Sequence, residues 1–374
     1  MRTSYREDDV VFLLKDITGM VEPQPTEERE KLIQAGRHYC EMLPIEYTPS
    51  EAYMEAYQEA LENYAAPTAL AIGVLADKII AQKGSRIVLV SLARAGTPIG
   101  ILLKRYIWRT YHIAVKHYSI SIIRGKGIDR NAMKFLLERH LPEELLFVDG
   151  WIGKGAILKE LRKEIAAFPG VSDEIAVVAD PAKVTKLCGT HEDILIPSSC
   201  LNSTVSGLVS RTFLRDDIIG EQDFHGAVYY GELKDVDLSY GFIAAIEKEF
   251  PLLSKGSLQE KRANAERAPR EAAEDAAANP AGLQECPRDG LEEAVQIADK
   301  FGVSDLNFIK PGIGETTRVL LRRVPWKILV SSRLKGDKAL AHIVKLAQEK
   351  GVPIEYYPLY HYKSCGIIRQ MADL

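Results

Sequence analysis

Continuous apolar runs alternate with amphipathic stretches along roughly the first 200 residues of the chain. Apolar runs predict strands at 87–92 (IVLVSL), 113–123, 145–149 (LLFVD), 174–179 (EIAVVA) and 193–196 (DILI). Apolar residues at helical spacing predict helices at 50–64, from there to Gly84, and at 98–108, 129–137 and 155–168. Strands that alternate with helices pair in parallel through right-handed crossovers. We therefore expect an α/β fold with a doubly wound, parallel sheet.

Ligands of such sheets bind at the carboxyl ends of the strands. Three segments follow predicted strands: SLARAGTP (91–98), SIIRGKGID (121–129) and VDGWIGKGA (148–156). In the last, Asp149 ends an apolar strand, glycines permit a tight turn, and the next helix offers free N–H groups to an anion. Lys154 adds a positive charge, so the segment predicts a phosphate site in which Asp149 accepts from sugar hydroxyls, directly or through Mg²⁺. A plain strand-to-helix turn capped by Asp149 is the open alternative.

Composition narrows the class of protein. The chain has 374 residues, a formal net charge of -4 and 27% charged residues, which is typical of a soluble globular protein. Its five cysteines lack the CxxC spacing of zinc ribbons, so we expect no metal-binding cysteine motif and a reducing compartment. The charged start and the lack of a ~20-residue apolar run predict no signal peptide, no membrane span and a cytoplasmic location.

Residues 254–285 contain only Leu258 and Leu283 as apolar side chains larger than alanine. Such a segment buries too little surface to offset the entropy of ordering, so we interpret it as a flexible linker. The predicted domains are therefore 1–253 and 286–374, and alternating elements in the second predict a small α/β/α sandwich.

A basic segment in the second domain predicts binding to RNA. Between Gly312 and Lys345, eight Lys/Arg stand against two acids, and no aromatic stacking platform interleaves them, so the sequence does not support single-strand binding by stacking. Glycines allow close backbone approach, a glutamate would accept from a guanine amino group, and arginines would meet phosphates. The candidate RNA-binding residues are Gly312, Gly314, Glu315, Arg318, Arg322 and Arg323. A solvated basic helix face is the open alternative.

A polar turn at 198–204 precedes a helix expected after Asn202 or Ser203, and contains Cys200. A thiolate at a helix N-terminus has a lowered pKa, so Cys200, with His191 upstream, is an alternative nucleophile. Cys40 and His117 are expected to be packing residues.

Five segments in order resemble a known family. They are GRHYCEMLPIEY (36–47), SLARAGTPIG (91–100), HYSISIIRGKGID (117–129), FVDGWIGKGAI (147–157) and ILIPSSCLNSTVSGLVSRT (194–212). Together they resemble bacterial phosphoribosyltransferase-like proteins of tellurite-resistance and stress operons, which carry a C-terminal Pelota-type RNA-binding domain and are sometimes labelled cysteine proteases. The 148–156 segment is similar to the PRPP-binding element of type I phosphoribosyltransferases, with Gly150 in place of the second acid and Lys154 in place of a threonine.

The resemblance implies a type I phosphoribosyltransferase-like fold joined to a Pelota-like, kink-turn-binder-like domain. It implies a transferase that acts on PRPP or a related ribose 5-phosphate, with Mg²⁺, in synthesis of a nucleotide-like metabolite. The implied catalytic residues are Asp149, Arg94, Arg124 and Lys126. The implied phosphate-binding residues are Ala95, Gly96, Thr97, Gly150, Gly153, Lys154, Gly155 and Ala156. Two alternatives stay open, a non-catalytic nucleotide- or PRPP-sensing RNA-binding regulator and a cysteine-dependent hydrolase that uses Cys200. A homo-oligomer is also compatible with the sequence.

Overall fold

A computed structural model describes residues 1–253, the N-terminal part, and 287–368, the C-terminal part. The predicted linker at 254–285 lies outside the described residues. The N-terminal part contains a six-stranded sheet with the order β1-β4-β3-β7-β8-β9, in which every pairing is parallel. Its strands are β1 (Val11–Phe12), β3 (Val88–Leu92), β4 (Lys116–Ile120), β7 (Leu145–Trp151), β8 (Ile175–Ala179) and β9 (Cys188–Thr190). The predicted parallel α/β sheet is therefore confirmed.

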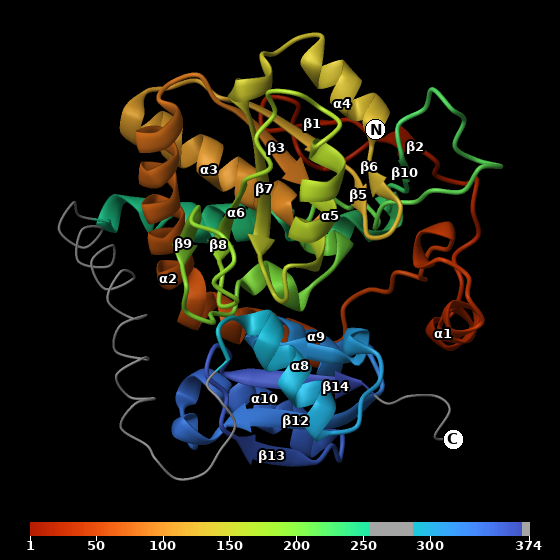
Figure 1. Ribbon diagram of the computed structural model, residues 1–374, viewed down its shortest axis with the longest axis vertical. Helices are drawn as coiled ribbons and strands as arrows, with labels where there is room; N and C mark the ends of the chain where they lie inside the picture. The colour runs from red at the N-terminus through yellow and green to blue at the C-terminus, as the bar shows by residue number, and fades with distance from the viewer. Residues whose placement is uncertain (254–286, 369–374) are drawn as a thin grey trace.

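Helices cover both faces of this sheet (Figure 1). On one face lie α2 (Glu51–Lys83), α3 (Gly96–Tyr111) and α6 (Ser239–Glu247), and on the other α4 (Arg130–Leu137) and α5 (Ala156–Ile165). Successive side chains of a strand point to opposite faces, so in β7 Leu146 and Val148 pack with the first group while Leu145 and Phe147 pack with the second. Both faces of β7 are therefore apolar, which is why its sequence shows no alternation.

Three local expectations are wrong. Residues 193–196 are not a strand, and the sheet ends instead in β9, where Gly189 lets the backbone approach α2 closely. The two helices expected between 50 and Gly84 form the single helix α2, with Pro67 inside it. The helix expected after Asn202 is the short 3-10 turn η4 (Ser203–Val205), preceded by η3 (Pro197–Cys200). The hydroxyl of Ser206 donates to the Asn202 carbonyl (2.8 Å), a local bond that competes with helix formation.

Shorter elements surround the main sheet. They are β2 (Lys15–Asp16) paired with β10 (Gly226–Ala227), the hairpin β5 (Ile122–Ile123) and β6 (Gly127–Ile128), α1 (Thr26–Gln34), and the 3-10 turns η1 (Tyr39–Glu41), η2 (Pro142–Glu144), η5 (Gly231–Val236) and η6 (Phe250–Leu252). The segment 124–126, which carries the predicted catalytic cations Arg124 and Lys126, is the turn of the β5–β6 hairpin.

The C-terminal part has a four-stranded sheet with the order β11-β14-β12-β13, in which only β12 and β13 are parallel. Its strands are β11 (Ile309–Pro311), β12 (Pro325–Ser331), β13 (Ile354–Tyr357) and β14 (Ser364–Ile368). Helix α8 (Gly290–Lys300) packs on one face, and α9 (Ile313–Arg322) and α10 (Ala341–Glu349) pack on the other. The 3-10 turns η7 (Leu306–Phe308), η8 (Ser332–Leu334) and η9 (Lys338–Leu340) connect these elements.

The two parts share one apolar core. Side chains of α2 and of the Cys200 turn belong to the same cluster of buried residues as Ile313 and Leu320 of α9. Hydroxyls of α2 also reach across, where Tyr53 donates to the Leu321 carbonyl and Tyr64 to the Ala339 carbonyl (3.2 Å). Helix α9 therefore lies directly against the end of the first sheet (Figure 1).

Among the described helices, only α2 is long and apolar enough to cross a bilayer, with a mean hydropathy of 1.4 over its most apolar stretch. More than half of that stretch (56%) is buried inside the protein. Such burial is typical of a core helix. A single helix of this kind is therefore weak evidence for a membrane span.

Candidate functional site

A cavity of about 270 Å³ lies between the carboxyl ends of the first sheet and the start of the C-terminal part. The chain leaves β3 toward β4 on one side and later continues through β7 to β8 on the other, so the strand order reverses between β3 and β7. Ala95 follows β3, Asp149 lies near the end of β7, and both line the cavity. The predicted place of a ligand site, a topological switch point, thus coincides with a real cavity.

Asp149 lines this cavity. The N–H of Gly150 donates to its carboxylate (2.7 Å), but burial dominates and raises its pKa from 3.8 to about 7, although the charge of Arg318 acts in the opposite direction. A carboxyl group with this pKa exchanges its proton near neutral pH. Sequence reasoning placed Asp149 correctly at the rim, but a fully ionised sugar-binding carboxylate does not follow from this environment.

Replacing Asp149 by asparagine is expected to change the pH dependence of stability. The folded state holds the Asp149 proton more tightly than the unfolded state, so stability falls as pH rises from about 4 to about 7. Asparagine never ionises, so the variant should be more stable than wild type by about 2 kcal/mol at pH 8, allowing for partial exposure, and equal at pH 4. Urea unfolding at both pH values measures this, and equal differences at the two would contradict the assigned pKa.

Of the predicted cations Lys154, Arg124 and Lys126, the first two line the cavity and the third does not. Lys154 lines the cavity, but its ammonium donates to the carbonyls of Leu306 and Ile309 (2.7 Å for the latter), and burial lowers its pKa to about 8. Arg124 also lines the cavity and donates to the Asn307 side chain (2.5 Å). Both side chains therefore join the two parts of the protein. Lys126 does not line the cavity, and its ammonium lies 3.9 Å from Glu41.

The segment after β3 acts mainly in packing. A Cβ at Gly96 would lie 2.4 Å from the Val148 carbonyl oxygen, so only glycine fits there. Thr97 is buried and its hydroxyl bonds that of Ser119 (2.8 Å). Arg94 donates to Asn202 (2.9 Å) and to the Val209 carbonyl (3.1 Å), and does not line the cavity. Of the predicted phosphate-binding residues, the cavity lining includes Ala95, Gly153, Lys154, Gly155 and Ala156.

The cavity does not suit Mg²⁺. Its lining contains two carboxyl groups, of which Asp149 has a pKa near 7 and Glu315 forms an ion pair with Arg318 (3.0 Å). Arg124, Lys154, Lys310 and Arg318 line the same cavity and would repel a divalent cation. These residues do not provide the set of free anionic oxygens that Mg²⁺ requires.

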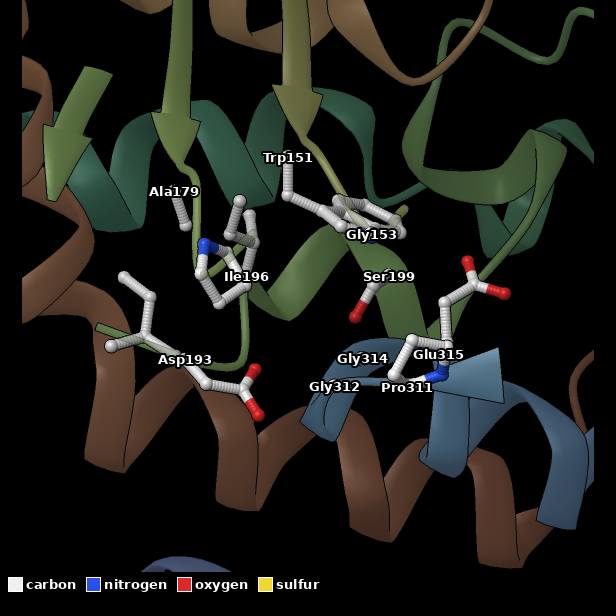
Figure 2. Close-up of a pocket in the computed structure, with 12 residues that line it drawn as sticks. Trp151, Gly153, Ala179, Asp193, Ile196, Ser199, Pro311, Gly312, Gly314 and Glu315 are labelled. Atoms are coloured by element: carbon white, nitrogen blue, oxygen red, sulfur yellow. The ribbon is translucent and has the colours of Figure 1, made fainter. Parts of the chain in front are cut away.

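The predicted RNA-binding turn and helix face the rim of the N-terminal part. The Asp193 carboxylate accepts from the N–H of Ile313 (3.0 and 3.1 Å) and therefore caps α9. The same carboxylate accepts from the N–H of Lys363 (2.8 Å). Figure 2 shows Asp193 beside Gly312, and Ser199 between Trp151 and Gly314. They surround a small pocket of about 10 Å³, room for a single water molecule.

Of the remaining predicted RNA-binding residues, Arg318 lies over the Trp151 ring (5.7 Å) and pairs with Glu315. Arg323 is exposed, whereas the side chain of Arg322 lies outside the described residues. Glu315 and Arg318 therefore line the cavity, where the Arg318 side chain is 37% exposed, and Arg323 reaches solvent at the end of α9.

A cysteine, a histidine and an aspartate meet at the carboxyl ends of β8 and β9. The Cys188 Sγ lies 3.5 Å from Nε2 and 3.7 Å from Nδ1 of His191, and Nδ1 lies 2.8 Å from the Asp180 carbonyl oxygen and 3.7 Å from its carboxylate. A carbonyl only accepts, so Nδ1 carries the proton and Nε2 is the unprotonated nitrogen near the thiol. We call these residues the Cys188 triad.

The groups of the Cys188 triad are buried to different extents. Cys188 and Asp180 have no exposed surface, whereas the His191 side chain is 22% exposed. Burial raises the pKa of the Cys188 thiol to about 12, although the nearby charge of Lys78 lowers it, and burial also raises the pKa of Asp180. One ligand atom from each lies within 4.8 Å of the others, a spacing that would also suit a metal ion.

Sequence reasoning missed the Cys188 triad. It expected a strand at 193–196, which placed His191 in a loop, and it paired His191 with Cys200. The available signal was the spacing of Cys188 and His191, three residues apart where the last short strand ends, with Asp180 directly after β8.

Cys200, the predicted nucleophile, is completely buried in η3, and its thiol contacts the Ala56 carbonyl (3.8 Å). Cys40 is also buried, but it has a histidine partner, since its Sγ lies 2.9 Å from Nδ1 of His38. Nε2 of His38 bonds the Arg124 carbonyl (3.1 Å), and burial raises the pKa of the Cys40 thiol to about 11. Cys40 and His38 are thus a second cysteine–histidine pair. His117 is buried between Ser91 (2.7 Å) and the Asp9 carbonyl (2.9 Å), as expected for a core histidine.

Comparison with known proteins decides the family. Residues 3–247 match the family described as tellurite-like stress resistance cysteine protease StiP. A cysteine protease StiP of Acinetobacter baylyi is 34% identical over 359 residues, which cover 92% of this chain and 88% of the relative.

The chain belongs to the StiP family.

Membership in the StiP family confirms the resemblance noted in the sequence, including the second domain type, because residues 288–370 match the PELOTA RNA binding domain family. This match supports binding of RNA by the C-terminal part. Among solved structures, a hypoxanthine-guanine phosphoribosyltransferase of Bacillus anthracis is 19% identical over 33% of this chain and 71% of its own, with a TM-score of 0.24. A likeness at this TM-score carries no argument about fold or activity.

The expected activity was wrong. The sequence predicted a phosphoribosyltransferase-like transferase, but the StiP relative that covers most of the chain is named a cysteine protease, a hydrolase. The structure gives a physical reason why the resemblance misled. Lys154, the phosphate-loop cation, is bound to backbone carbonyls, and of the two carboxyl groups in the cavity lining Glu315 is paired with Arg318 and Asp149 has a raised pKa.

Proposed function

We propose that the protein is a cysteine-dependent hydrolase of peptide bonds, with Cys188 as nucleophile, His191 as general base and Asp180 as the group that orients His191. The observation that carries the proposal is the contact between the three groups: Nδ1 of His191 donates to the Asp180 carbonyl, which leaves Nε2 unprotonated 3.5 Å from the Cys188 thiol. This is the arrangement in which a histidine activates a nucleophile while a third group fixes its tautomer.

The reaction begins with proton transfer. Because burial raises the thiol pKa to about 12, the resting pair is a neutral thiol and a neutral imidazole. Nε2 of His191 takes the proton as Sγ attacks the substrate carbonyl, and the imidazolium then gives that proton to the departing amine. Water, deprotonated by the same Nε2, hydrolyses the thioester and restores the thiol. The nearby charge of Lys78 favours the thiolate during attack.

Access to Cys188 requires movement. The thiol has no exposed surface, and His191 is the member of the triad that reaches solvent. A substrate would therefore approach from the side of His191, with displacement of neighbouring side chains. The predicted cytoplasmic location is compatible with a free thiol, and we retain it as part of the proposal.

Alkylation tests the proposal. The full-length protein is incubated with a labelled unfolded protein such as casein, with and without prior iodoacetamide, and the alkylated cysteines are mapped by mass spectrometry. We expect hydrolysis that is lost in proportion to modification of Cys188. Loss of hydrolysis that follows modification of Cys40 or Cys200 would reassign the nucleophile, and absence of thiol-sensitive hydrolysis would refute the proposal.

A separate observation favours RNA binding by the C-terminal part. Lys335 lies over the Tyr356 ring (5.1 Å), Arg333 over Tyr360 (5.2 Å), and Lys327 over Trp326 (5.6 Å). Trp326 and Tyr356 are 38% and 43% exposed. The basic segment of the sequence did not reveal this arrangement, because Tyr356 and Tyr360 lie beyond it and Tyr356 comes close only through the pairing of β13 with β12. We name these six residues the aromatic–basic face, and propose that it binds single-stranded RNA by stacking and phosphate contacts.

The variants Tyr356→Ala and Lys335→Gln should each weaken RNA binding by about tenfold, because a stacked base contributes about 1–3 kcal/mol and a phosphate contact a comparable amount at low salt. Fluorescence anisotropy with a labelled single-stranded RNA measures this. Tyr47→Ala, which removes an exposed tyrosine (68%) of the N-terminal part, is the control. If Arg318→Glu abolishes binding while Tyr356→Ala does not, the RNA site is the predicted α9 element instead.

A further inference from the structure

The C-terminal part holds one flank of the Cys188 triad. Ala182, two residues after Asp180, has no exposed surface and packs in the same apolar cluster as Cys188. Its carbonyl accepts from the N–H of Gly290, the first residue of α8 (3.1 Å). The two backbones lie in close contact, because a Cβ at Gly290 would be 2.8 Å from the Cα of Ala182. The loop that carries Asp180 is therefore fixed to α8.

The other flank of the Cys188 triad is held as well. Asp193, two residues after His191, is 5% exposed and lies beside Gly312 (Figure 2). Its carboxylate accepts from the N–H of Ile313, where α9 begins, and of Lys363, just before β14 (2.8 Å). Separation would leave a buried carboxylate and two backbone donors without partners, which costs free energy. The segment that carries His191 is therefore fixed to the C-terminal part.

The contacts on the two flanks are connected to each other. The carboxylate of Glu293 in α8 is 2% exposed and accepts from the N–H of Tyr360 (2.8 Å) and of His361 (2.7 Å). The hydroxyl of Tyr362 donates to the Gly153 carbonyl (2.5 Å), and Lys363 follows. Helix α8 and residues 360–363 thus form one unit, and we call Gly290, Glu293 and residues 360–363 the clamp.

Tyr360 belongs both to the clamp and to the aromatic–basic face. Arg333 lies over its ring (5.2 Å), while its N–H is bound to Glu293. A base that stacks on this face of the ring displaces Arg333, and Tyr360 is only three residues from Lys363, which holds Asp193. From these contacts we infer that the clamp keeps the Cys188 triad closed, and that single-stranded RNA bound at the aromatic–basic face releases it.

The inference rests on the proposed hydrolase and the proposed RNA site, and adds regulation of the first by the second. The closed state is the one described above, in which Cys188 has no exposed surface. RNA shifts the equilibrium only by as much as it binds the open state more tightly than the closed one. This coupling is reciprocal, so a variant whose clamp stays open must bind RNA more tightly by the same factor.

Alkylation of Cys188 in the full-length protein tests the inference without relying on hydrolysis. Mass spectrometry follows the rate at which iodoacetamide modifies Cys188, with and without a saturating single-stranded RNA whose binding is measured by fluorescence anisotropy. RNA should raise this rate at least about fivefold. Cys200, which is also completely buried, is the internal control, and its rate should change less than about twofold because RNA does not unfold the core.

Gly290→Ala should open the clamp without touching the aromatic–basic face. Its Cβ would lie 2.0 Å from the Tyr362 hydroxyl as well as against Ala182, so α8 must shift away. Without RNA, Cys188 should be alkylated at least about fivefold faster than in wild type, and RNA should bind more tightly by the same factor. Gly241→Ala, with nothing within 4 Å of its Cβ position, is the matched control and should change neither quantity.

Glu293→Gln is the second variant if Gly290→Ala does not fold, and should give the same pattern, because an amide cannot accept both N–H groups as the carboxylate does. An alkylation rate that bound RNA leaves unchanged would overturn the inference, as would a variant with an open clamp that binds RNA no more tightly than wild type. Absence of RNA binding would remove the inference together with the RNA site. RNA-dependent alkylation without any hydrolysis would support the clamp and reject only the hydrolase.

Discussion

Replacing Cys188 by alanine is expected to lower the rate of peptide-bond hydrolysis by about 10³-fold or more, because no other group of the Cys188 triad can form the covalent intermediate. His191→Ala should have a similar effect, since its Nε2 lies 3.5 Å from the thiol and accepts the proton. The double variant should be no slower than either single one, because residues that act as a unit are not additive. Initial rates with a fluorogenic peptide measure all three.

The control for this prediction is Cys200→Ala, at the nucleophile that the sequence suggested. Its thiol is buried against the Ala56 carbonyl, so the change should leave the hydrolysis rate within about threefold of wild type unless it loosens the core. EDTA should have no effect on wild type. Inhibition by EDTA that zinc reverses would mean that Asp180, Cys188 and His191 hold a metal ion, and would contradict the thiol mechanism.

Gly189→Ala is expected to destabilise the protein by about 3 kcal/mol and to abolish hydrolysis with it. Gly189 follows Cys188 in β9, and a Cβ there would lie 2.2 Å from the Ala71 carbonyl oxygen of α2. Neither backbone can yield without separating the sheet edge from the helix, so the strand that carries Cys188 must shift. Thermal unfolding of both proteins measures the loss, and hydrolysis is assayed well below the lower Tm.

The matched control is Gly241→Ala in α6. This glycine is exposed, and nothing lies within 4 Å of the position of its Cβ. Alanine is favoured over glycine inside a helix by about 1 kcal/mol, so this variant should be slightly more stable than wild type. A Gly189→Ala protein as stable as Gly241→Ala would show that β9 does not lie against α2 as described.

The central sheet could be predicted because strands that are buried on both faces have continuous apolar sequences. Leu145–Val148 of β7 pack against helices on each side, so the run reads as a strand without further context. The edge could not be predicted in this way. β9 has three residues and contains Gly189, which is unfavourable in a strand, and only the space that it leaves beside α2 explains it.

In the candidate site, too, the features set by local sequence could be predicted and those set by strand pairing or burial could not. Asp149 and the glycine turn follow a recognisable strand, so their place at the rim was predictable, but the raised pKa of Asp149 depends on burial in the folded protein. The Cys188 triad was out of reach because its geometry depends on the pairing of β8 with β9. The aromatic–basic face likewise depends on β13 lying beside β12.

Asp193 bears on how the chain can be divided. Its carboxylate belongs to the N-terminal part, yet it holds the first N–H of α9 and the N–H of Lys363. A fragment that begins near residue 287 would therefore lack the group that caps α9, and a fragment that ends near 253 would leave that carboxylate without its backbone donors, beside newly exposed apolar surface. The sequence divides between the two parts, but the contacts that stabilise each part cross that division. The two family matches cover separate ranges of the chain, whereas the two parts share one core and stabilise each other.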